Sequence, residues 1–179
     1  MTLALTFADK KLLDTAVIGP DGAVHYTTTT TSGLRGRKIT TVGAASGIIG
    51  FINWRDKTFV INGVPRSWDD LKSRSGGLFS SEREWNWANR PFKLQYHDSH
   101  QELLATPLAG NIADTVRFTT SHPHLFHDND RAMIYFPYQM QDEIERMFIL
   151  MAVLHTETHR QDEQARVARN AAITSSTAS

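Results

Sequence analysis

The feature that most constrains this chain is a run of eight consecutive apolar side chains, MFILMAVL, at residues 147–154. The polar residues Gln141, Asp142 and Glu143 precede the run in a way typical of a helix start, and a polar stretch follows it at 155–160. Eight consecutive residues face every direction around a helix, so this segment has no polar face that could contact water. Spanning a membrane requires about 20 apolar residues. We therefore predict a helix that is buried on all sides within the protein itself.

Most of the chain before this helix has the pattern of β-strands. Residues 2–7 alternate between larger apolar and smaller side chains with a period of two, which is typical of a half-buried strand. Short β-rich runs separated by turn residues indicate a sandwich or a barrel, and a β-structure curled around the helix would bury it. The expected strands are 2–7, 13–18, 23–32, 39–42, 48–54, 58–61, 84–87, 91–96, 102–106, 114–120 and 131–136.

Local signals mark turns and helix ends between these strands. Pro20 and Gly22 predict a hairpin turn, because proline fixes φ at one corner and glycine permits the positive φ of another. Ser67 precedes two acidic residues in the way of an N-cap, which predicts a short helix over 67–71. The Gly- and Ser-rich residues 73–81 are expected to form a mobile loop.

The chain length fits one domain with a sizeable core. The long helix is expected over residues 140–169, so the predicted domain is 1–169, followed by a disordered tail at 170–179. The N-terminus has no basic lead or long apolar stretch, and it therefore predicts a strand rather than a signal peptide. We expect a cytoplasmic protein with no transmembrane segment.

Composition excludes several classes of function. Nineteen Lys and Arg residues balance nineteen Asp and Glu residues, so the protein has no overall positive charge that would attract nucleic acid. We therefore do not expect nucleic acid as a partner. The absence of cysteine excludes disulfides, thiolate metal sites and a Cys nucleophile. No phosphate-binding glycine motif and no GxSxG nucleophile motif occur, and we expect no cofactor.

The order of these segments resembles an uncharacterised fungal family, largely from mushroom-forming species. That family shares an opening strand, a Pro-Asp-Gly hairpin, a basic turn, an apolar strand ending in Trp, a strand leading into a short helix, and a final acid-led apolar helix. The corresponding residues here are 3–7, 20–22, 35–38, 48–54, 59–71 and 142–154, and the resemblance covers roughly residues 2–160.

The fungal family is in turn similar to the tubby C-terminal, LURP-one and phospholipid-scramblase group. This resemblance implies a mainly β fold, a closed antiparallel β-barrel of about twelve strands around a buried C-terminal α-helix. It also implies lipid-headgroup binding or membrane-tethered regulation rather than enzyme chemistry. No motif for the phosphoinositide-binding residues of tubby proteins occurs here, and the scramblase calcium segment and palmitoylated cysteines are absent.

Histidines provide the candidate metal ligands. His155 and His159 lie four positions apart and therefore share one face of the helix, the spacing that metal sites use. Glu157 lies on the opposite face, so this is not the zinc-protease HExxH arrangement. Further ligands would have to come from a loop containing His122, His124 and His127. The alternative is that the residues after 154 form a solvated helix exit.

The compact basic turn of Arg35, Arg37 and Lys38 is the candidate ligand-binding site, since Gly33 and Gly36 would let the backbone approach a phosphate closely. The alternative is a solvated hairpin tip. The four tryptophans could stack bases or sugars, but the surrounding apolar alternation favours core packing. The sequence thus predicts a non-enzymatic module that binds anionic lipid or a protein. The alternative is a small enzyme with a histidine-based, metal-dependent site at the mouth of the barrel.

Overall fold

A computed structural model of the chain describes residues 2–34, 36–74, 83–88, 90–97, 102–120 and 131–176. It contains one sheet and one long helix. The strands are β1 (Thr2–Phe7), β2 (Thr15–Ile18), β3 (Val24–Gly33), β4 (Gly36–Ala44), β5 (Ile49–Asn53), β6 (Thr58–Ile61), β7 (Val64–Ser67), β8 (Lys72–Arg74), β9 (Arg83–Asn86), β10 (Pro91–His97), β11 (Glu102–Pro107), β12 (Val116–Thr119) and β13 (Met133–Pro137). The helices are α1 (Trp68–Leu71), the 3₁₀ turn η1 (Ile112–Asp114) and α2 (Glu143–Ser176).

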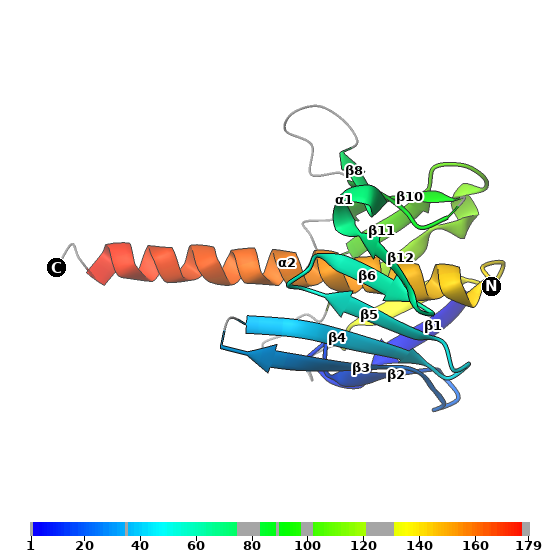
Figure 1. The fold of residues 1–179 in the computed structure, drawn as a ribbon, viewed down its shortest axis with the longest axis horizontal. Coiled ribbons are helices and arrows are strands. Elements are labelled where there is room, and N and C mark those ends of the chain that lie inside the picture. Colours follow the sequence, from blue (N-terminus) through cyan, green and yellow to red (C-terminus); the bar gives the residue numbers. More distant parts are fainter. Residues whose placement is uncertain are drawn as a thin grey trace.

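The thirteen strands form a single antiparallel sheet in the order β7-β6-β5-β4-β3-β2-β1-β13-β12-β11-β10-β9-β8. Nearly every pair joins neighbours in the chain; the pairing of β1 with β13 brings the two halves together. Figure 1 shows the strands arranged around the first half of α2. The edge strands β7 and β8 are not hydrogen-bonded to each other, but the four-residue helix α1 connects them.

The turns form where the sequence predicts them. Gly22 has a φ of +80° in the hairpin between β2 and β3. The Ser67 side chain accepts a hydrogen bond from the backbone N–H of Asp70 and caps α1, as expected. Asn62 and Gly63 both have positive φ, and they turn β6 directly into β7, a strand that the sequence does not predict.

The centre of the fold is the apolar part of α2. Every side chain from Met147 to Leu154 is at most 1% exposed, which confirms a helix buried on all sides. Inward-facing strand residues pack around it, among them Phe7, Ile52 and Phe118. At Gly50 the helix approaches the sheet so closely that an added Cβ would lie 2.6 Å from the Met151 sulfur, so a larger residue would require the buried Met147 and Met151 side chains to move.

The prediction of the helix end was wrong. α2 begins at Glu143, where Asp142 accepts a hydrogen bond from the Ile144 N–H, and continues to Ser176 instead of ending at 169. Residues 170–176, expected in the disordered tail 170–179, are therefore helical. Residues 161–172 are all exposed, yet most of them are Ala, Arg or Gln, which have high helix propensity without any packing.

The strand β8 was also not expected, and it occupies the start of the predicted loop at 73–81, the rest of which lies outside the described residues. None of the helices in the described part of the chain has the length and apolar character that crossing a membrane requires.

Candidate functional site at the helix exit

The candidate site lies where α2 leaves the strands, which we call the exit end. The hairpin of β3 and β4 reaches along the projecting helix there, and Arg37 on β4 forms an ion pair with Asp162 on α2. At the opposite end, the entry end, Arg90 forms ion pairs with Asp114 and with Glu145 in the first turn of α2. The helix rises about 1.5 Å per residue, so Glu145 and Asp162 lie about 25 Å apart along its axis.

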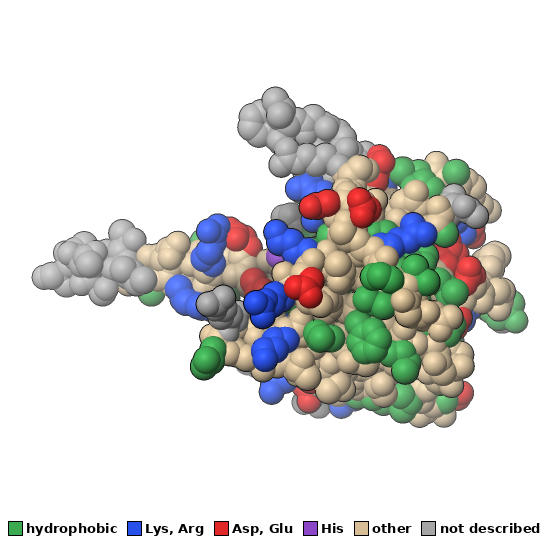
Figure 2. All heavy atoms as spheres, viewed as in Figure 1, with side chains coloured by type: hydrophobic (Ala, Val, Ile, Leu, Met, Phe, Trp, Pro, Cys, Tyr) green, Lys and Arg blue, Asp and Glu red, His purple; other side chains and the backbone are tan. Residues whose placement is uncertain are grey.

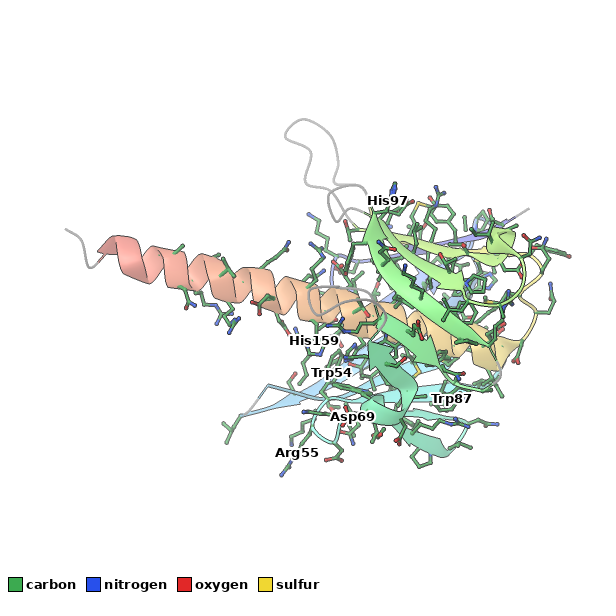
Figure 3. The ribbon with its side chains drawn as sticks, turned by 90° about the horizontal axis from the view of Figure 1, so that it is seen from above. Trp54, Arg55, Asp69, Trp87, His97 and His159 are labelled. Carbon is green, nitrogen blue, oxygen red and sulfur yellow. The ribbon has the colours of Figure 1, made fainter. Side chains whose placement is uncertain are left out.

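Histidines and tryptophans pack together at the exit end. The His155 ring stacks on Trp54 with centroids 5.8 Å apart and planes 4° apart, and it meets the edge of Trp68 at 4.2 Å. His159 follows one turn later, 4.5 Å from His155 and 6.2 Å from Trp54, so the predicted shared face is confirmed. Figure 3 shows Trp54 and His159 side by side where the helix leaves the strands. The aromatic-histidine cluster consists of Trp54, Phe59, Trp68, Trp85, His155 and His159.

The expectation of a solvated helix exit was wrong at His155. Its side chain is only 3% exposed, and within the described part of the chain neither ring nitrogen has a hydrogen-bond partner. Burial lowers the pKa of His155 to about 2, assisted by the nearby His159 and Lys72. Burial also lowers the pKa of His159, again with Lys72 contributing. Neutral imidazole is the form that binds metal, but the positive charge of Lys72 near both histidines is unfavourable for a divalent cation.

Metal binding by these histidines is not supported by the described residues. No group of three or more His, Asp or Glu side chains in that part of the chain is placed to hold a metal ion. The positions of His122, His124 and His127 lie outside the described residues. The metal prediction therefore rests on the spacing of His155 and His159 alone.

Glu157 lies on another face of the helix, as the sequence predicts, and is fully buried. Its carboxylate accepts a hydrogen bond of 2.8 Å from the Tyr96 hydroxyl, two from the Arg160 guanidinium at 2.8 and 2.5 Å, and one of 2.8 Å from Gln161. Burial and the adjacent carboxylate raise the pKa of Tyr96. Every oxygen of this buried charge is satisfied, so the network holds α2 against β10 rather than presenting a free acid.

The tryptophans mostly serve the core. Trp68, Trp85 and Trp87 are buried, which confirms the prediction of core packing for these three. Trp54 is only half-buried, and its indole N–H donates to the Thr40 hydroxyl. The guanidinium of Arg37 lies 5.7 Å from the centre of the Trp54 ring. Trp54 therefore connects the aromatic-histidine cluster to the basic residues of the hairpin.

A hollow of about 690 Å³ opens beside Trp54. We call it the basic hollow, because its charged lining residues are all cations. Its lining consists of Gly33, Leu34, Gly36, Arg37, Lys38, Trp54 and Arg55. Figure 2 shows Lys and Arg side chains gathered on this face between the hairpin and the projecting helix. The structure thus brings two residues of the predicted basic turn to one hollow, while Arg35 lies outside the described residues.

The two described cations of the turn differ in how they are held. Arg37 donates two hydrogen bonds to Asp162, of 2.6 and 2.9 Å, which raises the pKa of the Arg37 guanidinium. Lys38 occupies an irregularity in the ladder, since Ser32 pairs with Arg37 and Thr31 pairs with Ile39. Arg55, on the turn between β5 and β6, was not predicted as a site residue. Arg55 is distant from Lys38 in the sequence, and the sequence alone does not reveal that β4 and β5 are neighbouring strands, which brings the two residues together.

Two other hollows are lined by both basic and acidic side chains, so they are less suited to a ligand that carries one sign of charge. A hollow of about 270 Å³ on the other side of Arg37 is lined by Lys10 and Lys11 but also by Asp14. A hollow of about 310 Å³ at the entry end is lined by Arg90 together with Asp142 and Glu145. The basic hollow is larger than both, and none of the described residues that line it carries a carboxylate.

Comparisons with known protein families, curated proteins and solved structures find no match for this chain.

Proposed function

We propose that the protein is a non-enzymatic binding module that attaches to an anionic lipid surface through the basic hollow. The observation that carries the proposal is the grouping of Arg37, Lys38 and Arg55 around one open hollow whose described lining residues include no carboxylate. The chain has zero net charge, so this grouping is a local feature and not a consequence of an overall basic composition. Phosphate and carboxylate groups of lipid heads are the ligands that such cations attract.

The expected attachment is weak and reversible. A basic residue near an anionic membrane contributes about 1 kcal/mol. Arg37 is already paired with Asp162, so Lys38 and Arg55 provide most of the attraction, roughly 2 kcal/mol together. Because the residues are near the surface, salt screens them within about 8 to 10 Å. Binding should therefore be strongest at low ionic strength.

The test is sedimentation of the protein with phosphatidylcholine vesicles that do or do not contain phosphatidylserine. Wild-type protein should bind only the anionic vesicles, and the double change Lys38→Glu, Arg55→Glu should abolish binding. A matched control is Arg66→Glu, Arg117→Glu, which alters the net charge equally at residues that lie over Trp87 and Tyr135, away from the basic hollow. Failure of the wild type to bind at low salt would reject the lipid surface and leave a protein partner as the ligand.

We also propose that this module belongs to the tubby C-terminal, LURP-one and scramblase-like group. A sheet that surrounds one C-terminal helix, with α1 connecting its two edge strands, is compatible with the closed barrel of that group. In a closed barrel, the edge amides of β7 and β8 would be protected from solvent. Slow hydrogen exchange of these amides would support closure, and exchange as fast as in exposed loops would contradict it.

A small enzyme is the second candidate, because His155 has two buried nitrogens that find no hydrogen-bond partner among the described residues. Unpartnered buried polar atoms are unusual and occur at catalytic or ligand sites. Metal analysis of the purified protein distinguishes the two functions. Stoichiometric zinc, iron, copper or manganese that is lost in a His155→Ala, His159→Ala variant would favour the enzyme.

A further inference from the structure

The hairpin of β3 and β4 extends beyond the strands on either side of it. β3 has ten residues and β4 has nine, whereas β2 has four and β5 has five. Pairing with β2 reaches only Thr28 on β3, and pairing with β5 reaches only Ile39 on β4. The residues beyond these points therefore form a projecting tip.

Leu34 lies at this tip and is fully exposed, with a relative accessibility of 109%. Gly33 pairs with Gly36, so a two-residue connection forms the turn, and Gly36 has a φ of +95°. The turn geometry is provided by glycine and does not require a leucine in this exposed position. It is the most exposed large apolar side chain among the described residues.

Basic residues lie directly behind this leucine. Leu34 lines the basic hollow together with Arg37, Lys38 and Arg55. An apolar tip followed by a ring of cations matches the two layers of a membrane surface, acyl chains below and anionic headgroups above. Long basic side chains can reach the headgroups while their methylene stems lie against apolar chains. The charge complementarity identifies an anionic bilayer as the occupant of this surface.

We propose that Leu34 inserts into the boundary between headgroups and acyl chains of an anionic membrane, while Arg37, Lys38 and Arg55 contact the headgroups. This proposal rests on the proposed function and adds a defined depth and orientation to it. Headgroup attraction alone is fully sensitive to salt, whereas insertion of an apolar side chain is not. Part of the binding should therefore survive at physiological ionic strength.

The chain contains no cysteine, so Leu34→Cys provides a unique position for an environment-sensitive fluorophore such as NBD. On addition of phosphatidylserine-containing vesicles, the fluorophore at position 34 should brighten, shift to the blue and become shielded from an aqueous quencher. Ile112→Cys is the matched control, because Ile112 is 77% exposed and belongs to η1 near the Arg90–Asp114 ion pair of the entry end. Its fluorophore should be unchanged.

The unlabelled variants Leu34→Ser and Leu34→Met test the contribution to affinity. Burying a leucine side chain provides enough free energy that Leu34→Ser should weaken vesicle binding at least about tenfold, while Leu34→Met should remain near wild type. Melting temperatures should not change, since the Leu34 side chain is fully exposed. Wild-type binding with an unaffected Leu34→Ser and a water-exposed fluorophore at position 34 would overturn insertion but keep headgroup binding. Absence of wild-type binding would overturn both.

Discussion

Arg37 and Asp162 lie 125 positions apart in the chain, and their side chains form two parallel hydrogen bonds, Nη1 to Oδ2 at 2.6 Å and Nη2 to Oδ1 at 2.9 Å. The pair ties the projecting hairpin to α2 just beyond the buried part of the helix. The hydrogen bonds from Arg37 lower the pKa of the Asp162 carboxyl. An anionic ligand in the basic hollow would compete with Asp162 for the same guanidinium.

Reversing the charge of either residue in this pair should reduce stability only slightly. Arg37→Asp and Asp162→Arg should each reduce the free energy of unfolding by no more than about 1 kcal/mol, because the two side chains are 37% and 51% exposed and are screened by solvent. The double variant should regain part of that loss. The carboxyl pKa is lower in the folded state, so the stabilisation is present above about pH 4 and is lost as pH falls further. Chemical unfolding of the three variants at two pH values measures this, and a coupling that is independent of salt would contradict an exposed pair.

Position 153 tests whether α2 is truly enclosed. Val153 is 1% exposed, whereas Val167 on the projecting part of the same helix is 58% exposed. Val153→Asp should destabilise the protein by several kcal/mol, because it buries a carboxylate without a partner. Val167→Asp makes the same chemical change in water and should alter the melting temperature little. Equal effects of the two changes would contradict the enclosure.

The apolar run at 147–154 was sufficient to predict the centre of the fold. Because no face of that helix can contact water, a surrounding β-structure followed directly. Pro20, Gly22 and Ser67 also acted as predicted, since their effects on the backbone are local. Features that depend on a few neighbouring residues could therefore be predicted from the sequence.

Contacts between residues that are distant in the sequence could not be predicted. The polar stretch after Leu154 predicts a solvated exit, but Glu157 is buried because Tyr96, 61 positions away, donates to it. Arg55 joins Lys38 only because β4 and β5 are neighbours. Whether these side chains are buried or exposed depends on partners that are distant in the sequence. The local sequence does not show where those partners lie.

Truncation should separate the buried and projecting parts of α2. A chain ending at Glu163 keeps the buried residues 147–154 and the partners of Arg37 and Glu157, so it should melt cooperatively near the wild-type temperature. A chain ending at Asp142 loses roughly 10 to 20 kcal/mol of apolar burial, which matches or exceeds the usual net stability of a domain. It should not fold. Circular dichroism and thermal melting of both chains test this, and a folded short chain would disprove the central role of the helix.

The buried carboxylate of Glu157 should depend on its neighbours unequally. Tyr96→Phe removes one hydrogen bond to a charged group and should cost about 1.5 to 3 kcal/mol. Glu157→Gln leaves Arg160 without its charged partner in a partly buried position and should cost more, in the range of about 3 to 5 kcal/mol. Glu163→Gln is the control, because its ion pair with Arg166 is exposed and should contribute little. The order of the three losses in urea unfolding is the measurement, and a harmless Glu157→Gln would reject the network.

His155 should make the protein sensitive to acid. Its folded-state pKa of about 2 lies below the ordinary value near 6.5, so the unfolded chain binds a proton that the folded chain does not over that interval. The free energy of unfolding should therefore fall as pH drops below about 6.5, by up to about 1.4 kcal/mol per pH unit from this residue. His155→Phe keeps an aromatic ring against Trp54 and Trp68 and removes two unpartnered nitrogens. This variant should equal or exceed the wild type in stability at neutral pH.

The difference between the wild type and His155→Phe isolates this effect from the other histidines, including His159, which remain in both proteins. Unfolding in urea at several pH values between about 4 and 8 should give a gap that widens steadily as pH falls and is constant above about 6.5. His159→Phe provides a comparison, because the pKa of His159 is also lowered by burial and by Lys72, but its side chain is less buried than that of His155. Parallel pH profiles for wild type and His155→Phe would mean that the imidazole is hydrated or protonated in the folded protein, and the neutral aromatic-histidine cluster would then be wrong.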